Sequence, residues 1–296
     1  MLLTGLALAL TLAQGAPRQA APQTDETVAV QRGARLAVNN FAGEVVIRTW
    51  DKDSLHVVAR HQPRTTVSIR PGSASVSISS SGHMGPASVD YEITAPAWMP
   101  IRIEGTYNFV SVEGAQAEVY ASTVRGDVII KGGTGVVTAK SVEGEVQVEG
   151  ARGKVNVSSV NEKVRIADTT GDITAESVNG GIAMTGIDSK SVDASSVNGT
   201  ITYEGKLADG GHYNFGTHNG DVVLGLPDNV NATFTIRTFQ GSISTEFPLD
   251  GYNPREAQRG RRVTGTVGTG SADVSLETFG GGIRLRKGSA ARPRGR

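Results

Sequence analysis

The chain has 296 residues, of which 38 are Gly, none is Cys and only 5% are aromatic, and its formal net charge is zero. The lack of Cys excludes disulfides, thiolate metal sites, a Cys nucleophile and a lipidated N-terminal Cys. The apolar positions from residue 105 onward are mostly Val and Ile, which suit pleated strands better than helices. The composition therefore predicts an all-β protein.

The first segment, residues 1–15, has the pattern of a secretory signal peptide. Its apolar stretch is too short to cross a bilayer, and it ends in Ala13-Gln14-Gly15, which predicts cleavage after Gly15. A positive n-region is missing, because the first basic residue is Arg18. A buried N-terminal strand or helix is the alternative. Export is the expectation, with residues 16–26 as a linker.

Residues 27–104 contain strand-like runs without a regular period. The run Asn40–Ile47 already resembles the motif that repeats later in the chain. Terminal units of repeat proteins are atypical because they must close the stack. The sequence predicts an irregular N-terminal β segment that begins the stack and caps it.

The next part, residues 105–248, repeats one motif. It reads Ser or Thr, an apolar residue, one or two polar residues, Gly, and then alternating apolar positions, as in Ser141–Val148 and Ser177–Met184. The fourth motif position falls at 126, 144, 162, 180, 199, 220 and 241, and a second Gly column lies midway at 135, 153 and 171. Each unit of about 18 residues should hold two short strands joined by tight turns.

Two architectures fit this regular β-repeat. Asn-Gly at 179, 198 and 219 is a two-residue hairpin signal, which would give an antiparallel meander. In a β-solenoid, by contrast, successive units stack directly and like side chains meet in columns. The close likeness of successive units favours the β-solenoid, with the meander as the alternative.

The C-terminal part is predicted to contain a loop and a closing strand pair over residues 249–287, followed by a basic tail at 288–296. One helical turn is expected at Pro254–Gln258. From Tyr252 to Arg296 the chain carries ten Lys or Arg against three acids. Such an end is commonly only solvated, and attraction to anionic envelope lipid or polysaccharide is the functional alternative. Nucleic acid is not expected as a partner of an exported protein.

No catalytic, cofactor-binding or metal residue is predicted. The histidines His56 and His61 are five residues apart in a strand-like run, which places them on opposite faces, and His218 fills a motif position held by Val elsewhere. The acids at 127, 172 and 221 each follow a Gly at a strand start. Their expected role is to cap turns, because a Ca²⁺ site needs several converging oxygens.

The order of motifs resembles a known family. The chain opens with Val38–Ile47 and Trp50–Asp53, repeats Ser-Val-Asn-Gly, and closes with Gly265–Gly270 and Leu276–Gly281. It is similar to the bacterial β-strand-repeat family of unknown function whose members are often labelled “putative adhesin”. The resemblance implies a β-helix-like fold and an envelope location, and it brings no catalytic residues.

The function expected from the sequence is that of an exported, non-enzymatic cell-envelope or surface protein, adhesin-like or scaffolding in role. Its location would be periplasmic, at the cell surface or extracellular. A polysaccharide-acting β-helix enzyme is the alternative, and it would need acids clustered on adjacent units. A third hypothesis is self-assembly through an open solenoid end, unless the irregular ends block it.

Overall fold

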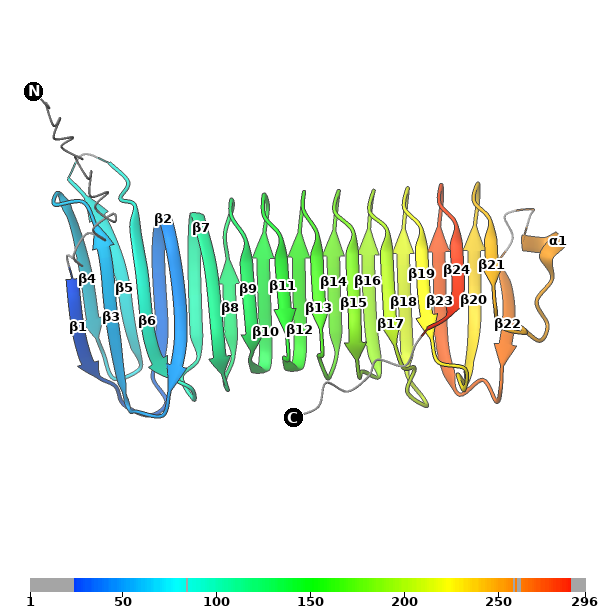
Figure 1. Cartoon of the computed structure of the whole chain (residues 1–296), viewed down its shortest axis with the longest axis horizontal. Coiled ribbons are helices and arrows are strands. Elements are labelled where there is room, and N and C mark those ends of the chain that lie inside the picture. The colour runs from blue at the N-terminus through cyan, green and yellow to red at the C-terminus, as the bar shows by residue number, and fades with distance from the viewer. Residues whose placement is uncertain (1–23, 84, 258, 260–261, 289–296) are drawn as a thin grey trace, which may run out of the picture.

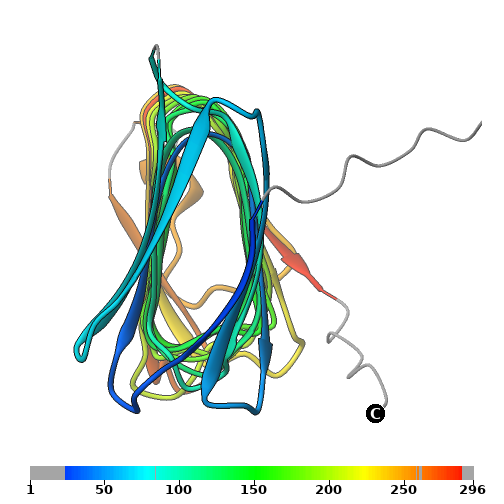
Figure 2. The ribbon, with the colours of Figure 1, turned by 90° about the vertical axis from the view of Figure 1, so that its left-hand side faces the viewer.

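The computed structural model describes residues 24–83, 85–257, 259 and 262–288, which wind into a long, flattened β-solenoid (Figure 1). Viewed along the axis, the coils superimpose into a narrow oval with two long sides (Figure 2). The prediction of an all-β solenoid is confirmed. The predicted signal peptide and all but the first residue of the predicted basic tail lie outside the described residues.

The two long sides are called face A and face B. Face A consists, in spatial order, of β4 (Thr65–Pro71), β5 (Ser75–Gly82), the first half of β2 (Arg35–Trp50), the first half of β7 (Ile101–Ala115), β8 (Val119–Ser122), β10 (Thr134–Ser141), β12 (Arg152–Ser159), β14 (Ile173–Ser177), β16 (Ser191–Ser196), β18 (His212–Thr217), β23 (Ala272–Thr278), β20 (Ala232–Thr238) and β22 (Val263–Val267).

Face B lies opposite. It consists of β1 (Thr24–Ala29), β3 (Ser54–His61), β6 (Val89–Pro96), the second halves of β2 and β7, β9 (Val128–Gly132), β11 (Val146–Glu149), β13 (Val164–Ala167), β15 (Ile182–Ile187), β17 (Ile201–Gly205), β19 (Val222–Leu226), β24 (Ile283–Lys287) and β21 (Ile243–Thr245). The helical turn α1 (Pro254–Ala257) follows β21, where one helical turn was predicted.

Parallel pairing distinguishes the solenoid from the meander. Val137 of β10 pairs in register with Val119 of β8 on one side and with Val155 of β12 on the other, so equivalent residues of successive units stack directly. The Asn-Gly pairs lie in turns that carry the chain from face A to face B, for example Asn179-Gly180 between β14 and β15. They are therefore not hairpin turns between paired strands.

The core fills the space between the faces with columns of apolar side chains. One column on face A runs through Val119, Val137, Val155, Ile173, Val192, Tyr213, Val274 and Phe234, all buried. Each buried Val, Ile or Phe side chain contributes about 1.5–3 kcal/mol relative to exposure. A column of this kind holds a chain without disulfides together.

The core becomes aromatic in the C-terminal third. Tyr203, Tyr213 and Phe215 pack ring against ring, with the centroids of Tyr203 and Phe215 5.3 Å apart. The hydroxyl of Tyr203 donates to the Lys206 carbonyl at 2.7 Å, and that of Tyr213 donates to the Ser189 carbonyl at 2.5 Å. Burial raises the pKa of both phenols above the usual value, most strongly for Tyr203.

Both ends of the solenoid depart from chain order. At the N-terminal end, β2 lies between β7 and the later-numbered β5 and β6, and antiparallel strands β1, β3 and β4 finish the stack. At the C-terminal end, β23 lies between β18 and β20, and β24 lies between β19 and β21. The last two strands in sequence therefore form the penultimate coil, and β22 pairs antiparallel with β20 outside it.

Candidate functional site

The motif turns form one narrow edge of the solenoid and are built around a buried hydroxyl. Ser196 Oγ donates to the Gly180 carbonyl of the preceding coil at 3.2 Å and accepts from the Gly199 amide of its own turn at 2.9 Å. Thr217 and Thr278 make the same two bonds in their coils. The first motif position thus binds its own turn to the coil before it.

The fourth motif position is close to the neighbouring backbone. A Cβ added at Gly199 would stand 1.9 Å from the Gly180 carbonyl oxygen, and one at Gly220 would stand 2.0 Å from the Gly199 oxygen. Contacts this short are impossible, so the tight stacking of these turns requires glycine. Asn108 and Glu162 replace glycine in two coils, which are the exceptions in the column.

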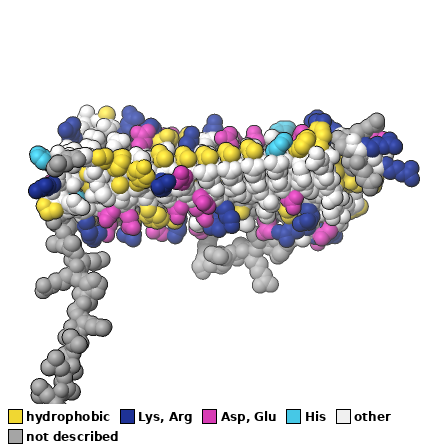
Figure 3. All heavy atoms as spheres, turned by 90° about the horizontal axis from the view of Figure 1, so that it is seen from above, with side chains coloured by type: hydrophobic (Ala, Val, Ile, Leu, Met, Phe, Trp, Pro, Cys, Tyr) yellow, Lys and Arg dark blue, Asp and Glu magenta, His cyan; other side chains and the backbone are white. Residues whose placement is uncertain are grey.

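The second motif position points outward, because the hydroxyl before it points inward. Along the axis these residues form a single file, which we call the ridge. It consists of Phe41, Thr106, Val124, Val142, Val160, Val178, Val197, His218, Phe279 and Phe239. Figure 3 shows hydrophobic side chains in a row along this edge, with a histidine among them near one end. The five valines are 36–48% exposed.

The ridge accounts for most of the exposed apolar surface. Ten large apolar side chains are exposed in the described part of the chain, and eight of them belong to the ridge. Tyr107 stands directly beside it, and only Val136 lies elsewhere. Exposed apolar residues that occur singly need no explanation, whereas a large contiguous apolar patch is typical of a contact surface, so the ridge is a candidate for one.

Aromatic residues occupy both ends of the ridge. The rings of Phe41 and Tyr107 meet edge to face at a centroid distance of 5.4 Å. At the other end, the ring of Phe279 stacks on His218 at 4.9 Å and lies 5.2 Å from the ring of Phe239. The ring of Phe279 therefore contacts the rings of both neighbouring ridge residues.

A polar column runs beside the ridge, at the third motif position. The side-chain amide of Asn179 donates to the carboxamide oxygen of Asn161 at 2.8 Å, and the step is repeated from Asn198 to Asn179 and from Asn219 to Asn198. The next residue of the column is Gly280, which has no side chain. The Asn ladder fixes the turns and gives the ridge a neutral border.

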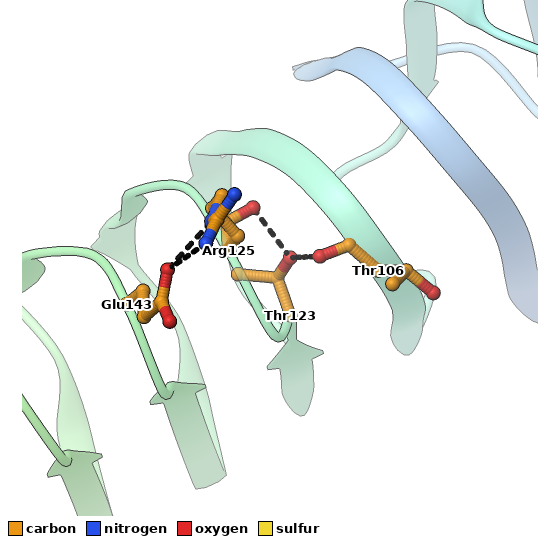
Figure 4. A network of polar contacts seen from close by, with 4 residues as sticks. All are labelled: Thr106, Thr123, Arg125 and Glu143. Atoms are coloured by element: carbon orange, nitrogen blue, oxygen red, sulfur yellow. Dashed lines mark hydrogen bonds and ion pairs between the residues drawn. The ribbon is translucent and has the colours of Figure 1, made fainter.

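Towards the N-terminus the same column is charged (Figure 4). The guanidinium of Arg125 donates to the Glu143 carboxylate at 2.6 Å and lies over the ring of Tyr107. The Thr123 hydroxyl, within 3.2 Å of the carbonyls of Thr106 and Arg125, ties this turn to the coil before it. Arg125 and Glu143 neutralise each other, so this border too carries no net charge.

The structure separates the histidines from one another. His56 bonds to Asp25 at 2.8 Å, while His61 bonds to Thr24, both at the N-terminal cap. His212 lies on the outside of face A, 3.4 Å from Asp273. His218 belongs to the ridge. In the residues that the structure describes, no group of three or more His, Asp or Glu could hold a metal ion.

The three acids at strand starts are also placed apart. Asp127 accepts the Glu145 amide and Asp221 accepts the Gly282 amide, each at 2.8 Å, so both cap the turn of the next coil. This confirms turn-capping for these two. Asp172 lies at the opposite edge of the solenoid, after the Gly171 turn, and does not approach them.

A shallow hollow of about 370 Å³ lies on the outside of face A, over β16, β18, β23 and β20. Two acids border it, and each is already bound to a neighbour: Asp193 accepts from Asn214 at 3.1 Å, and Asp273 faces His212. Both acids therefore already contact side chains of neighbouring strands, and the His212–Asp273 pair is largely exposed to solvent. The ridge is therefore the better candidate site.

The ridge was missed in the sequence because an apolar motif position suggests the core. The signal that would have revealed it is the alternation within the motif. Ser141 and Ser159 point inward, so the valines that follow them, Val142 and Val160, must point outward.

The fold and the repeated turns together define a β-solenoid of stacked two-strand coils. The chain belongs to the family described as Toastrack DUF4097, whose model matches residues 21–286. This confirms the resemblance to a family of β-strand-repeat proteins. In the described residues, no helix is long and apolar enough to cross a membrane.

Two solved structures are similar in outline. One is titled a “putative cell adhesion protein” from Clostridium sporogenes, with 9% identity, a TM-score of 0.29, and coverage of 89% of this chain and 99% of that one. The other is titled a “putative adhesin” from Bacteroides fragilis, with 12% identity, a TM-score of 0.40, and coverage of 88% and 96%. No curated protein matches the chain.

Proposed function

We propose that this chain is an exported, non-enzymatic surface protein of the bacterial cell envelope, adhesin-like or scaffolding in role, and that it makes its contacts along the ridge. The observation that carries the proposal is the gathering of eight exposed apolar side chains in one file. Burying such a row against a partner releases its hydration water and stabilises the complex. The rigid solenoid holds the row straight, so little ordering is required when it binds.

The contact role of the ridge can be tested by placing charged residues on it. We expect Val160→Lys combined with Val178→Lys to weaken co-sedimentation of the purified chain with isolated cell envelopes at least tenfold. The matched control is Val136→Lys, because Val136 is about as exposed but lies on the opposite edge. There the equivalent residue of the next coil is already a lysine, Lys154. Equal binding of all three chains would refute a contact role for the ridge.

Export and envelope attachment are tested separately. A tagged full chain should appear outside the cytoplasm, and deletion of residues 1–15 should retain it inside. Binding to anionic vesicles and to cell-wall polysaccharide, with and without residues 288–296, tests the basic tail across a salt series. Tail-dependent binding should weaken with salt because the attraction of Arg and Lys for anionic surfaces is screened. Cytoplasmic retention of the full chain would refute export.

A further inference from the structure

We propose that the ridge binds a second copy of this chain, ridge to ridge and antiparallel, with a two-fold axis between Val160 and Val178. This inference rests on the proposed contact role of the ridge and names its partner. It is carried by three features of the described residues: the spacing of the ridge, the order of residues along it, and the notch at Gly280 in the column beside it.

The spacing makes the ridge complementary to itself. Each coil contributes one ridge residue, and neighbouring parallel strands are about 4.8 Å apart. A second copy presents side chains at the same interval, so each ridge residue of one chain can meet one ridge residue of the other along the whole length. A two-fold interface uses the same patch on both partners, and equal spacing keeps the opposed residues level from one end of the ridge to the other.

The order of residues suits an antiparallel pair. The ridge has ten positions, with aromatic residues at its ends and valines at its centre. Turning one copy end over end places a ring against a ring at the outermost positions and a valine against a valine at the central ones, while Thr106 meets Phe279 and Val124 meets His218. The opposed pairs are Phe41 with Phe239, Thr106 with Phe279, Val124 with His218, Val142 with Val197, and Val160 with Val178.

The neighbouring column distinguishes the antiparallel pair from a parallel one. The antiparallel two-fold brings the third motif position of one copy against that of the other. Tyr107, the bulkiest exposed side chain of this column, then faces Gly280, where the column has no side chain. Arg125 faces Asn219 and Glu143 faces Asn198, so no like charges oppose each other. In a parallel pair, Tyr107 would instead meet the column that holds Glu104.

The strength of the contact follows from its width. A stable interface uses about 20–30 residues and roughly 800 Å² from each partner. The ten ridge positions and the ten positions beside them stand at the lower end of that range, and several of them are small. We therefore expect a dimer that depends on concentration and forms most readily where copies are crowded together.

Disulfide trapping tests the register, and the chain is suited to it because it has no native Cys. Val142→Cys and Val197→Cys are made as separate variants carrying tags of different size. In the antiparallel pair, residue 142 of one copy faces residue 197 of the other, whereas two copies of residue 142 are three coils, about 14 Å, apart. A disulfide requires Cα atoms within about 7 Å.

The expected result is a cross-linked mixed dimer when the two variants are oxidised together, and no cross-link in either variant alone. Val136→Cys, on the opposite edge, is the exposed control and should remain monomeric. Self-linking of Val142→Cys would overturn the antiparallel arrangement. A mixture that yields no more dimer than the Val136→Cys control would overturn the proposal.

Sedimentation separates this inference from the proposed function. The weight-average mass of the native chain should rise towards twice the monomer value with concentration, and Val160→Lys with Val178→Lys should hold it at the monomer value. A native chain that stays monomeric, while the double variant loses envelope binding, would leave the ridge as a contact surface and overturn self-association. Circular dichroism on the double variant verifies that it is folded.

Discussion

Replacement of Ser196 by Ala tests whether the buried hydroxyl column holds the turns in place. In the structure this hydroxyl makes two hydrogen bonds, at 3.2 Å to the Gly180 carbonyl and at 2.9 Å from the Gly199 amide. Alanine removes both, and the Gly199 amide is left in a buried turn without the acceptor. An unsatisfied buried polar group costs about 1–3 kcal/mol, so we expect a loss of about 2 kcal/mol of unfolding free energy.

The assay is urea unfolding followed by circular dichroism, with the slope compared between variants to establish that the denatured state is unchanged. Ser195→Ala, one residue away on the exposed side of the same strand, is the matched control and should change stability by less than about 0.5 kcal/mol. Ser196→Thr should restore the native value, since Thr217 fills this position in the next coil. If alanine at 196 proves as stable as the control, or threonine as damaging as alanine, the hydroxyl does not act as described.

Two other expectations concern the tight turns and the buried phenols. Gly199→Ala should lower the unfolding free energy by about 1–3 kcal/mol through overpacking, because its Cβ would meet the Gly180 carbonyl. Gly216→Ala, with open space around it, should not destabilise the protein. Urea unfolding of the two variants compares them, and equal stability would contradict the close-approach argument. Burial raises the folded-state pKa of Tyr203, so its contribution is complete below the unfolded value of about 10 and is lost as pH rises above it. The urea midpoint should therefore fall between pH 8 and a pH above 10, and it should fall less for Tyr203→Phe than for the native chain. An equal fall in the two chains would refute the assignment.

The regular coils could be predicted because their residues repeat in register. Val119, Val137 and Val155 occupy the same place in successive units, and direct stacking satisfies all of them at once. The Asn-Gly pairs were ambiguous in isolation, because the same dipeptide suits a hairpin. The likeness of whole units, rather than the turn residues, indicated that the strands stack in parallel.

The order of the coils at the two ends could not be predicted in the same way. The sequence shows that residues 271–286 form strands of the motif type, but every coil offers similar edges to a neighbour. Which gap they enter depends on the end of the stack, where β22 already pairs with β20. Phe247 and Leu249, which follow β21, pack against the core there, and neither belongs to the repeat.

The position of β23 and β24 has a consequence for how the protein is made. When the chain is synthesised or exported from its N-terminus, β20 and β21 emerge before β23 and β24, the strands that lie between them and the rest of the stack. Until the final residues arrive, β20 and β21 have no neighbour on their inner edge, and the coil of β18 and β19 ends the stack with bare backbone groups. Completion of the solenoid therefore waits for the last strands, and a chain interrupted before residue 272 keeps that open edge.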